Sequence, residues 1–102
     1  MSFLDLEDCK SLKALPESLK LKGGRLNLRN CALLTHLPDN MGEVAQLNLA
    51  GCINITALPA GLSITSWIDI GRSGIEKLPM SLSHVSVLRD GQTVAPETIF
   101  VD

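Results

Sequence analysis

Leucine and isoleucine recur along the chain with a period of about 21 residues. An aliphatic, polar, aliphatic triplet occurs at residues 4–6, 26–28, 47–49 and 68–70. A Leu-Pro pair follows each triplet, at residues 15–16, 37–38, 58–59 and 78–79. A small residue also lies three positions after the end of each triplet, and these residues are Cys9, Cys31, Cys52 and Ser73. Three landmarks in register over four copies predict a repeat protein.

The triplets predict strands, because alternation of aliphatic and polar residues is typical of a strand with one buried face. One unit is too small to fold alone, so its apolar face is covered only when the next unit stacks beside it. Similar strands stacked in one chain direction form a parallel sheet. Each return segment has about a dozen residues and contains a proline, so we expect extended or 3₁₀ structure there and little α-helix. The aliphatic residues of the returns should point into the core; they are Leu12, Leu15, Leu19, Leu34, Leu37, Met41, Ile55, Leu58, Leu62, Ile75, Leu78 and Leu82.

Residues 26–31, Leu-Asn-Leu-Arg-Asn-Cys, and residues 47–52, Leu-Asn-Leu-Ala-Gly-Cys, resemble the core motif of the leucine-rich repeat family, Leu-x-x-Leu-x-Leu-x-x-Asn/Cys. The short repeat with its Leu-Pro pair looks most like the bacterial subtype seen in secreted effectors. The cysteine followed by Leu-x-x-Leu-Pro is also similar to repeats of plant disease-resistance receptors. The resemblance implies an α/β-type leucine-rich repeat solenoid, a right-handed superhelix with a parallel β-sheet on its concave face. The first motif position is weakly apolar, with Met1, Gly23, Val44 and Thr65.

We expect residues 1–90 to form about four repeats and a partial fifth. In the fifth, Val85 and Leu88 take the expected aliphatic places, whereas Asp90 stands where the second buried aliphatic belongs. Residues 91–102 are therefore expected to form a C-terminal cap or to begin a following segment. At the other end, Met1 enters the first strand directly, which leaves an uncovered edge that favours self-association. This open end is compatible with a piece of a larger bacterial protein or effector.

Composition narrows the function. The net charge of −2 and the aromatic content of 3% argue against binding to nucleic acid. The three cysteines form no Cys-x-x-Cys pair, and no Ser, His and Asp are placed as a catalytic triad, so we expect no metal, no cofactor and no enzyme activity. We expect the cysteines to be free, buried thiols. No signal peptide and no apolar run long enough for a membrane span are visible, which predicts a cytoplasmic protein, or a secreted effector if the chain is part of a longer one.

The candidate binding surface is the exposed side of the strands, which is the concave face of the expected solenoid. Alternation assigns three columns to it. The first column comprises Phe3, Arg25, Gln46, Trp67 and Val87. The second comprises Asp5, Asn27, Asn48, Asp69 and Arg89, and the third comprises Glu7, Arg29, Ala50, Gly71 and Gly91. The candidate partner-binding residues are Phe3, Asp5, Arg25, Asn27, Arg29, Gln46, Asn48, Trp67 and Asp69. Exposed aromatic and Arg side chains are the types that anchor interfaces. The expected function is a non-catalytic module that binds a protein partner; the alternative is a purely structural spacer or capping domain.

Overall fold

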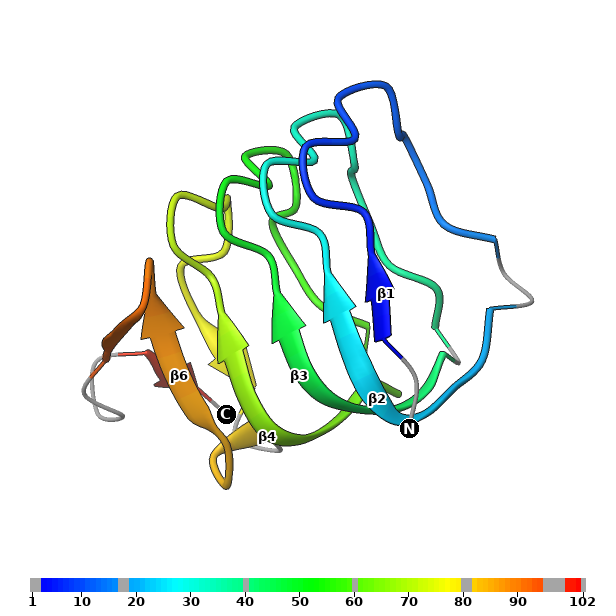
Figure 1. The fold of residues 1–102 in the computed structure, drawn as a ribbon. Coiled ribbons are helices and arrows are strands. Elements are labelled where there is room, and N and C mark those ends of the chain that lie inside the picture. Colours follow the sequence, from blue (N-terminus) through cyan, green and yellow to red (C-terminus); the bar gives the residue numbers. More distant parts are fainter. Residues whose placement is uncertain are drawn as a thin grey trace.

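The computed structural model describes residues 3–16, 19–39, 41–59, 61–79, 82–94 and 99–101. Five parallel strands lie side by side in one sheet, in the order β1 (Phe3–Asp5), β2 (Leu21–Asn27), β3 (Gly42–Asn48), β4 (Ser63–Asp69) and β6 (Ser86–Arg89) (Figure 1). β7 (Gln92–Thr93) pairs antiparallel with β6 at the end of this sheet. A second, two-stranded sheet joins β5 (Leu78–Pro79) to β8 (Phe100–Val101). The predicted solenoid with a parallel sheet is confirmed.

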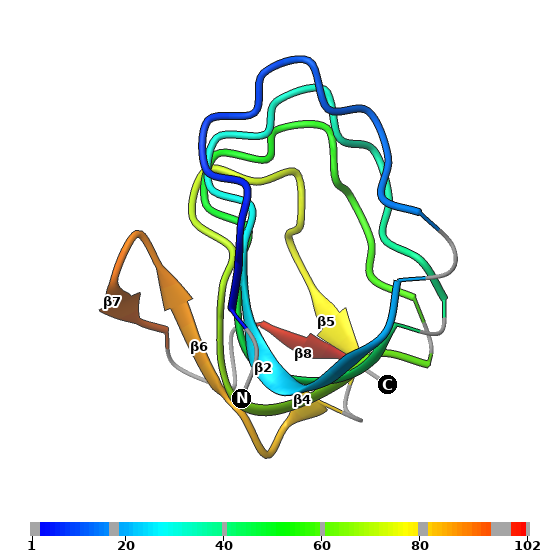
Figure 2. The ribbon, with the colours of Figure 1, turned by 45° about the vertical axis from the view of Figure 1, so that its right-hand side comes forward.

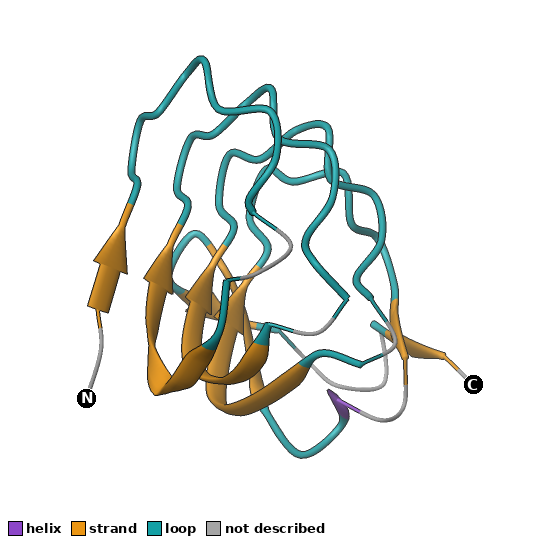
Figure 3. Cartoon of the chain, turned by 90° about the vertical axis from the view of Figure 1, so that its right-hand side faces the viewer, coloured by secondary structure: helices purple, strands orange, loops and turns teal. Residues whose placement is uncertain are grey.

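The return segments carry the chain from the end of one strand to the start of the next. They follow similar paths and lie one behind another, so that the coils nest (Figure 2). The strands of the large sheet lie on one side of the molecule, whereas the return segments and the small second sheet lie on the other (Figure 3). Helix in the described ranges is limited to a single 3₁₀ residue, Leu82. The expected scarcity of α-helix is therefore confirmed.

The core is a stack of aliphatic side chains enclosed by the coils. Both aliphatic residues of the second, third and fourth triplets are 0 to 1% exposed. The inward positions of the returns are buried as predicted, and Leu12, Leu19 and Leu58 are partly buried against the same cluster. Near the C-terminus, Ile99 is 2% exposed and belongs to this core. The domain boundary at residue 90 stays a prediction.

A tight turn follows each of the first four strands of the large sheet. The backbone N–H of Cys31 donates to the carbonyl of Leu28, which closes a four-residue turn, and the equivalent bonds form at Cys9, Cys52 and Ser73. The third residue of each turn has a positive φ; these residues are Asp8, Asn30, Gly51 and Arg72. Gly, Asn and Asp tolerate that conformation best. A Cβ on Gly51 would also crowd the side chain and backbone of Asn30 in the neighbouring coil, which adds to the preference for glycine in the third repeat.

The strands begin earlier than the triplets suggest. β2, β3 and β4 each have seven residues, and their first buried aliphatic positions do not follow a constant spacing. Val44 pairs with Gly24 and Ile64, and the register shifts near these residues in both pairings. Thr65, which we assigned to the first motif position, is exposed, whereas Ile64 is buried. Irregular pairing of this kind cannot be read from a fixed repeat length.

The predicted register of the fifth repeat is wrong by one residue. Val87 pairs with Ile68 and is buried, so it belongs to the core and not to the exposed column. Ser86 lies beside Trp67 instead, and Leu88 lies beside Asp69. The physical reason is that the fourth return is shorter than the earlier ones. Val85 and Val87, which are two residues apart along the chain, therefore supply the two buried side chains of this coil.

Candidate functional site: the outer face of the sheet

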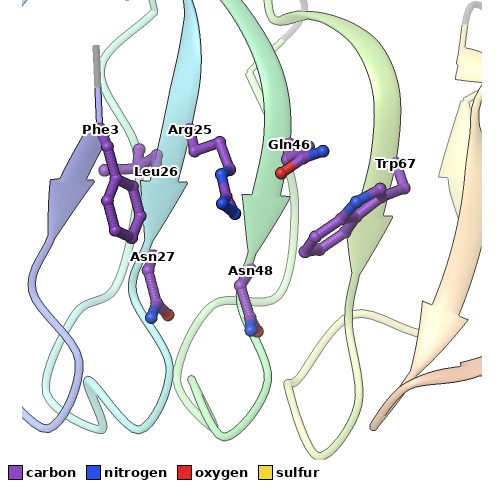
Figure 4. A pocket seen from close by; sticks show the side chains of 7 residues that line it. All are labelled: Phe3, Arg25, Leu26, Asn27, Gln46, Asn48 and Trp67. Atoms are coloured by element: carbon purple, nitrogen blue, oxygen red, sulfur yellow. The ribbon is translucent and has the colours of Figure 1, made fainter.

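The outer face of the large sheet, which points away from the core, carries a shallow pocket of about 160 Å³. The pocket crosses four strands. Its lining comprises Phe3 of β1, Arg25, Leu26 and Asn27 of β2, Gln46 and Asn48 of β3, and Trp67 of β4 (Figure 4). Six of these seven residues were candidates from the sequence. Leu26 was missed because its side chain belongs to the core, where it is 1% exposed.

Strand register brings the first column together. Phe3 pairs with Arg25, Arg25 with Gln46, and Gln46 with Trp67, so these four side chains stand in one row across the sheet. Phe3 is 59% exposed and Trp67 is half-buried. The guanidinium carbon of Arg25 lies 5.0 Å from the centre of the Phe3 ring, within the range of a cation–π contact. An aromatic side chain therefore stands at each end of the row, with a cation beside one of them.

The second column has a structural role that the alternation did not predict. In Asp5, Asn27, Asn48 and Asp69, the side-chain Oδ1 accepts a hydrogen bond from the backbone N–H two residues later. Such Asx turns redirect the chain at the end of a strand. Each of these side chains therefore stabilises the turn of its own coil, and its Oδ1 atom is already engaged in a hydrogen bond.

Asp69 does not reach the outer surface, although we predicted it as a partner-binding residue. It is 4% exposed, and its carboxylate accepts three backbone hydrogen bonds, from Gly71, Asp90 and Gly91. The last two N–H groups belong to the turn between β6 and β7, so these two hydrogen bonds hold that hairpin against the fourth coil. A sequence signal existed in the Asp90-Gly91 pair, because Asp-Gly is a typical hairpin turn.

Asp5 and Arg29 lie outside the pocket lining. Asp5 is exposed on β1, and Arg29 is half-buried in the turn that follows β2. Asn27, which lines the pocket, also contacts the turn after β1, because its Nδ2 donates to Oε1 of Glu7 at 3.0 Å. At the far end of the sheet, the exposed ion pair between Arg72 and Asp90 lowers the pKa of that carboxyl group.

The cysteines form an internal ladder and not a reactive site. Cys31 and Cys52 are buried, and their thiols donate to the carbonyls of Leu6 and Leu28 in the preceding coils. Burial raises the pKa of Cys31 and raises that of Cys52 to about 11. Cys9 is half-buried. All three are free thiols, as predicted, but the expected burial holds for Cys31 and Cys52 and not for Cys9.

The described residues contain no group of three or more His, Cys, Asp or Glu side chains arranged to hold a metal ion. They also contain no helix long and apolar enough to cross a membrane.

The fold and this face define a repeat solenoid with a pocket on its sheet. Among known proteins, the chain is similar to "Disease resistance protein RML1A" of Arabidopsis thaliana, with 28% identity over 92 residues. The match covers 86% of this chain and 9% of that protein, so the chain spans a small part of its relative. No family model and no solved structure matches the chain. The match accords with the similarity to plant disease-resistance repeats, while the bacterial Leu-Pro type stays a prediction.

The double position of Asn48, in the pocket and in a turn, gives a stability test. Asn48→Ala removes the acceptor for the N–H of Ala50, a residue that is 0% exposed, and should lower the free energy of unfolding by about 1–2 kcal/mol. Gln46→Ala, in the same pocket, should change it by no more than about 0.5 kcal/mol. Urea denaturation followed by circular dichroism measures both. Equal losses for the two variants would contradict the structural role of Asn48.

The thiol ladder predicts selective reactivity. At pH 8, a pKa of about 11 leaves about 0.1% of Cys52 as thiolate, and burial hinders the reagent further. In native buffer, a thiol reagent should therefore modify Cys9 first and Cys31 and Cys52 far more slowly. Mass spectrometry of the modified peptides measures the order, and all three should react rapidly in urea. Rapid native modification of Cys52 would show that this part of the core is open.

Proposed function

We propose that the chain is a non-catalytic protein-interaction module that binds its partner on the outer face of the sheet. The observation that carries this proposal is the row of Phe3, Arg25, Gln46 and Trp67, which borders a pocket across four strands. Aromatic and Arg side chains dominate the binding energy of many interfaces. In this chain, where aromatic residues are 3% of the total, two of the three stand on this one face.

The pocket lining also favours binding over catalysis. The described residues of the lining supply amide, aromatic, aliphatic and guanidinium groups, and none of them is Ser, Cys, His, Asp or Glu. None of these residues offers a nucleophile or a general base for catalysis. A repeat solenoid offers an extended surface that suits a polypeptide better than a small substrate. Binding of a protein segment is therefore the function that this geometry supports best.

A photo-crosslinker at the centre of the row tests this proposal. Gln46→p-benzoylphenylalanine places the reactive group between Arg25 and Trp67, and Lys13→p-benzoylphenylalanine places it on an exposed return segment as the matched control. After irradiation in an extract of the cells that make the protein, we expect a discrete polypeptide adduct from position 46 and none from position 13. Trp67→Ala should weaken this adduct at least tenfold while the melting temperature stays nearly unchanged.

Two results would contradict the proposal. An adduct from position 13 that survives Trp67→Ala would place the partner on the return segments. The absence of any adduct from position 46, in a chain that melts like the unmodified one, would favour the structural alternative, a spacer or capping solenoid.

A further inference from the structure

We propose that the pocket on the outer face binds a carboxylate side chain within an extended, acidic segment of a partner protein, with the guanidinium of Arg25 as its counter-charge. This inference rests on the proposed function and specifies the chemistry of the partner. Arg25 is the one charged residue among the described residues that line the pocket. It is exposed, and it forms no ion pair within the described part of the chain.

The contact with Phe3 leaves Arg25 able to bind such a group. A cation–π contact acts through the charge of the guanidinium and the face of the ring, and it does not require the five N–H donors as hydrogen-bond partners. The 5.0 Å contact restricts the side chain to one region of the face, so less conformational entropy is lost when a carboxylate binds. Two parallel N–H donors match the two oxygens of a carboxylate.

The second column indicates that negative charge is kept out of the pocket. Asp and Asn serve the turn equally well, because both offer the Oδ1 acceptor, and the chain uses both. Four coils line the pocket, and Asn occupies the two central ones, at positions 27 and 48, where its side chain is part of the lining. Asp occupies the two outer coils, at positions 5 and 69, and neither Asp side chain is part of the lining. The pocket therefore keeps its turns without a carboxylate that would neutralise Arg25.

The polar groups at the pocket floor are mainly free donors. Oδ1 of Asn48 is occupied by the N–H of Ala50, which leaves its Nδ2 available to an acceptor. The side chain of Gln46 forms no hydrogen bond with the other described residues, so its amide can bond to a peptide backbone. Glu7, an acid beside the pocket, already accepts the Nδ2 of Asn27. An acceptor-rich ligand such as a carboxylate complements this set.

The dimensions fit a short extended segment. Phe3 and Trp67 stand on strands three spacings apart, a span of about 14 Å at about 4.8 Å per strand. An extended chain covers about 3.3 Å per residue, so about four residues bridge the two aromatic rings. The acidic side chain would meet Arg25 near one end of that span, and an apolar side chain would pack on Trp67 at the other.

The test uses a displayed library of random heptapeptides as the probe, selected against the complete 102-residue chain. We expect the selected peptides to share an Asp or Glu and, about two or three residues away, an apolar residue. Arg25→Gln should weaken their binding at least tenfold, and Arg25→Lys should weaken it less. Asn48→Asp retains the turn acceptor and adds a negative charge to the pocket, so it should also weaken binding at least tenfold. Lys13→Gln makes the same change of charge on a return segment and should leave the affinity unchanged.

Three outcomes would overturn the inference. Peptides without an acidic position that bind in a manner sensitive to Trp67→Ala but not to Arg25→Gln would leave the proposed function standing and remove its acidic ligand. Tighter, Arg25-dependent binding of single-stranded oligo-dT than of any selected peptide would make the ligand a nucleic acid. Failure to select any peptide whose binding depends on this face would refute the acidic-segment ligand, whereas the cross-linking result at position 46 would still decide the proposed function separately.

Discussion

Burial of aliphatic side chains between successive coils is the interaction on which the rest of this structure depends. A single coil cannot cover its own leucines, whereas each neighbouring coil closes one side of them. Full burial of one such side chain is worth about 1.5–3 kcal/mol relative to exposure. Backbone hydrogen bonds hold neighbouring strands about 4.8 Å apart. The same spacing therefore governs both the inner ladder, with Leu26 beside Leu47, and the outer row, with Arg25 beside Gln46.

The stacking of the coils sets the rows of side chains on the outer face. The chemistry of that face is set by the residues that neither the core nor the turns require. The turn after each strand requires an acceptor, which Asp or Asn supplies, so the second column is only partly available for binding. The side chains of the first column accept no hydrogen bond from these turns. Phe3, Arg25 and Trp67 are therefore the residues whose presence the fold does not explain, and their arrangement around one pocket is the basis of the proposed interaction.

The repeat period predicted the solenoid, the parallel sheet and the buried positions of the returns, because each depends on landmarks that recur in every coil. The free cysteines were predicted separately, from their number and spacing. Prediction failed where coils differ from one another. The fourth return is shorter, which moved Val87 from the outer column into the core. Asp69 was read as an exposed residue because its column alternates outward, but the neighbouring hairpin covers it and supplies two of its donors. The pocket itself needed the register of four strands, which a period of about 21 residues leaves uncertain by one position.

The most direct test of the outer face as the binding surface is a heteronuclear NMR titration of the chain with a peptide selected from the heptapeptide library, in which chemical shifts are followed. The chain has one Trp, so its indole N–H gives a single, unambiguous signal from the far end of the pocket. The account predicts the largest shifts at this indole and at the backbone amides of Arg25 and Gln46, with small shifts on the return segments 31–39 and 52–59. Shifts concentrated on those returns, with an unmoved Trp67 indole, would contradict it.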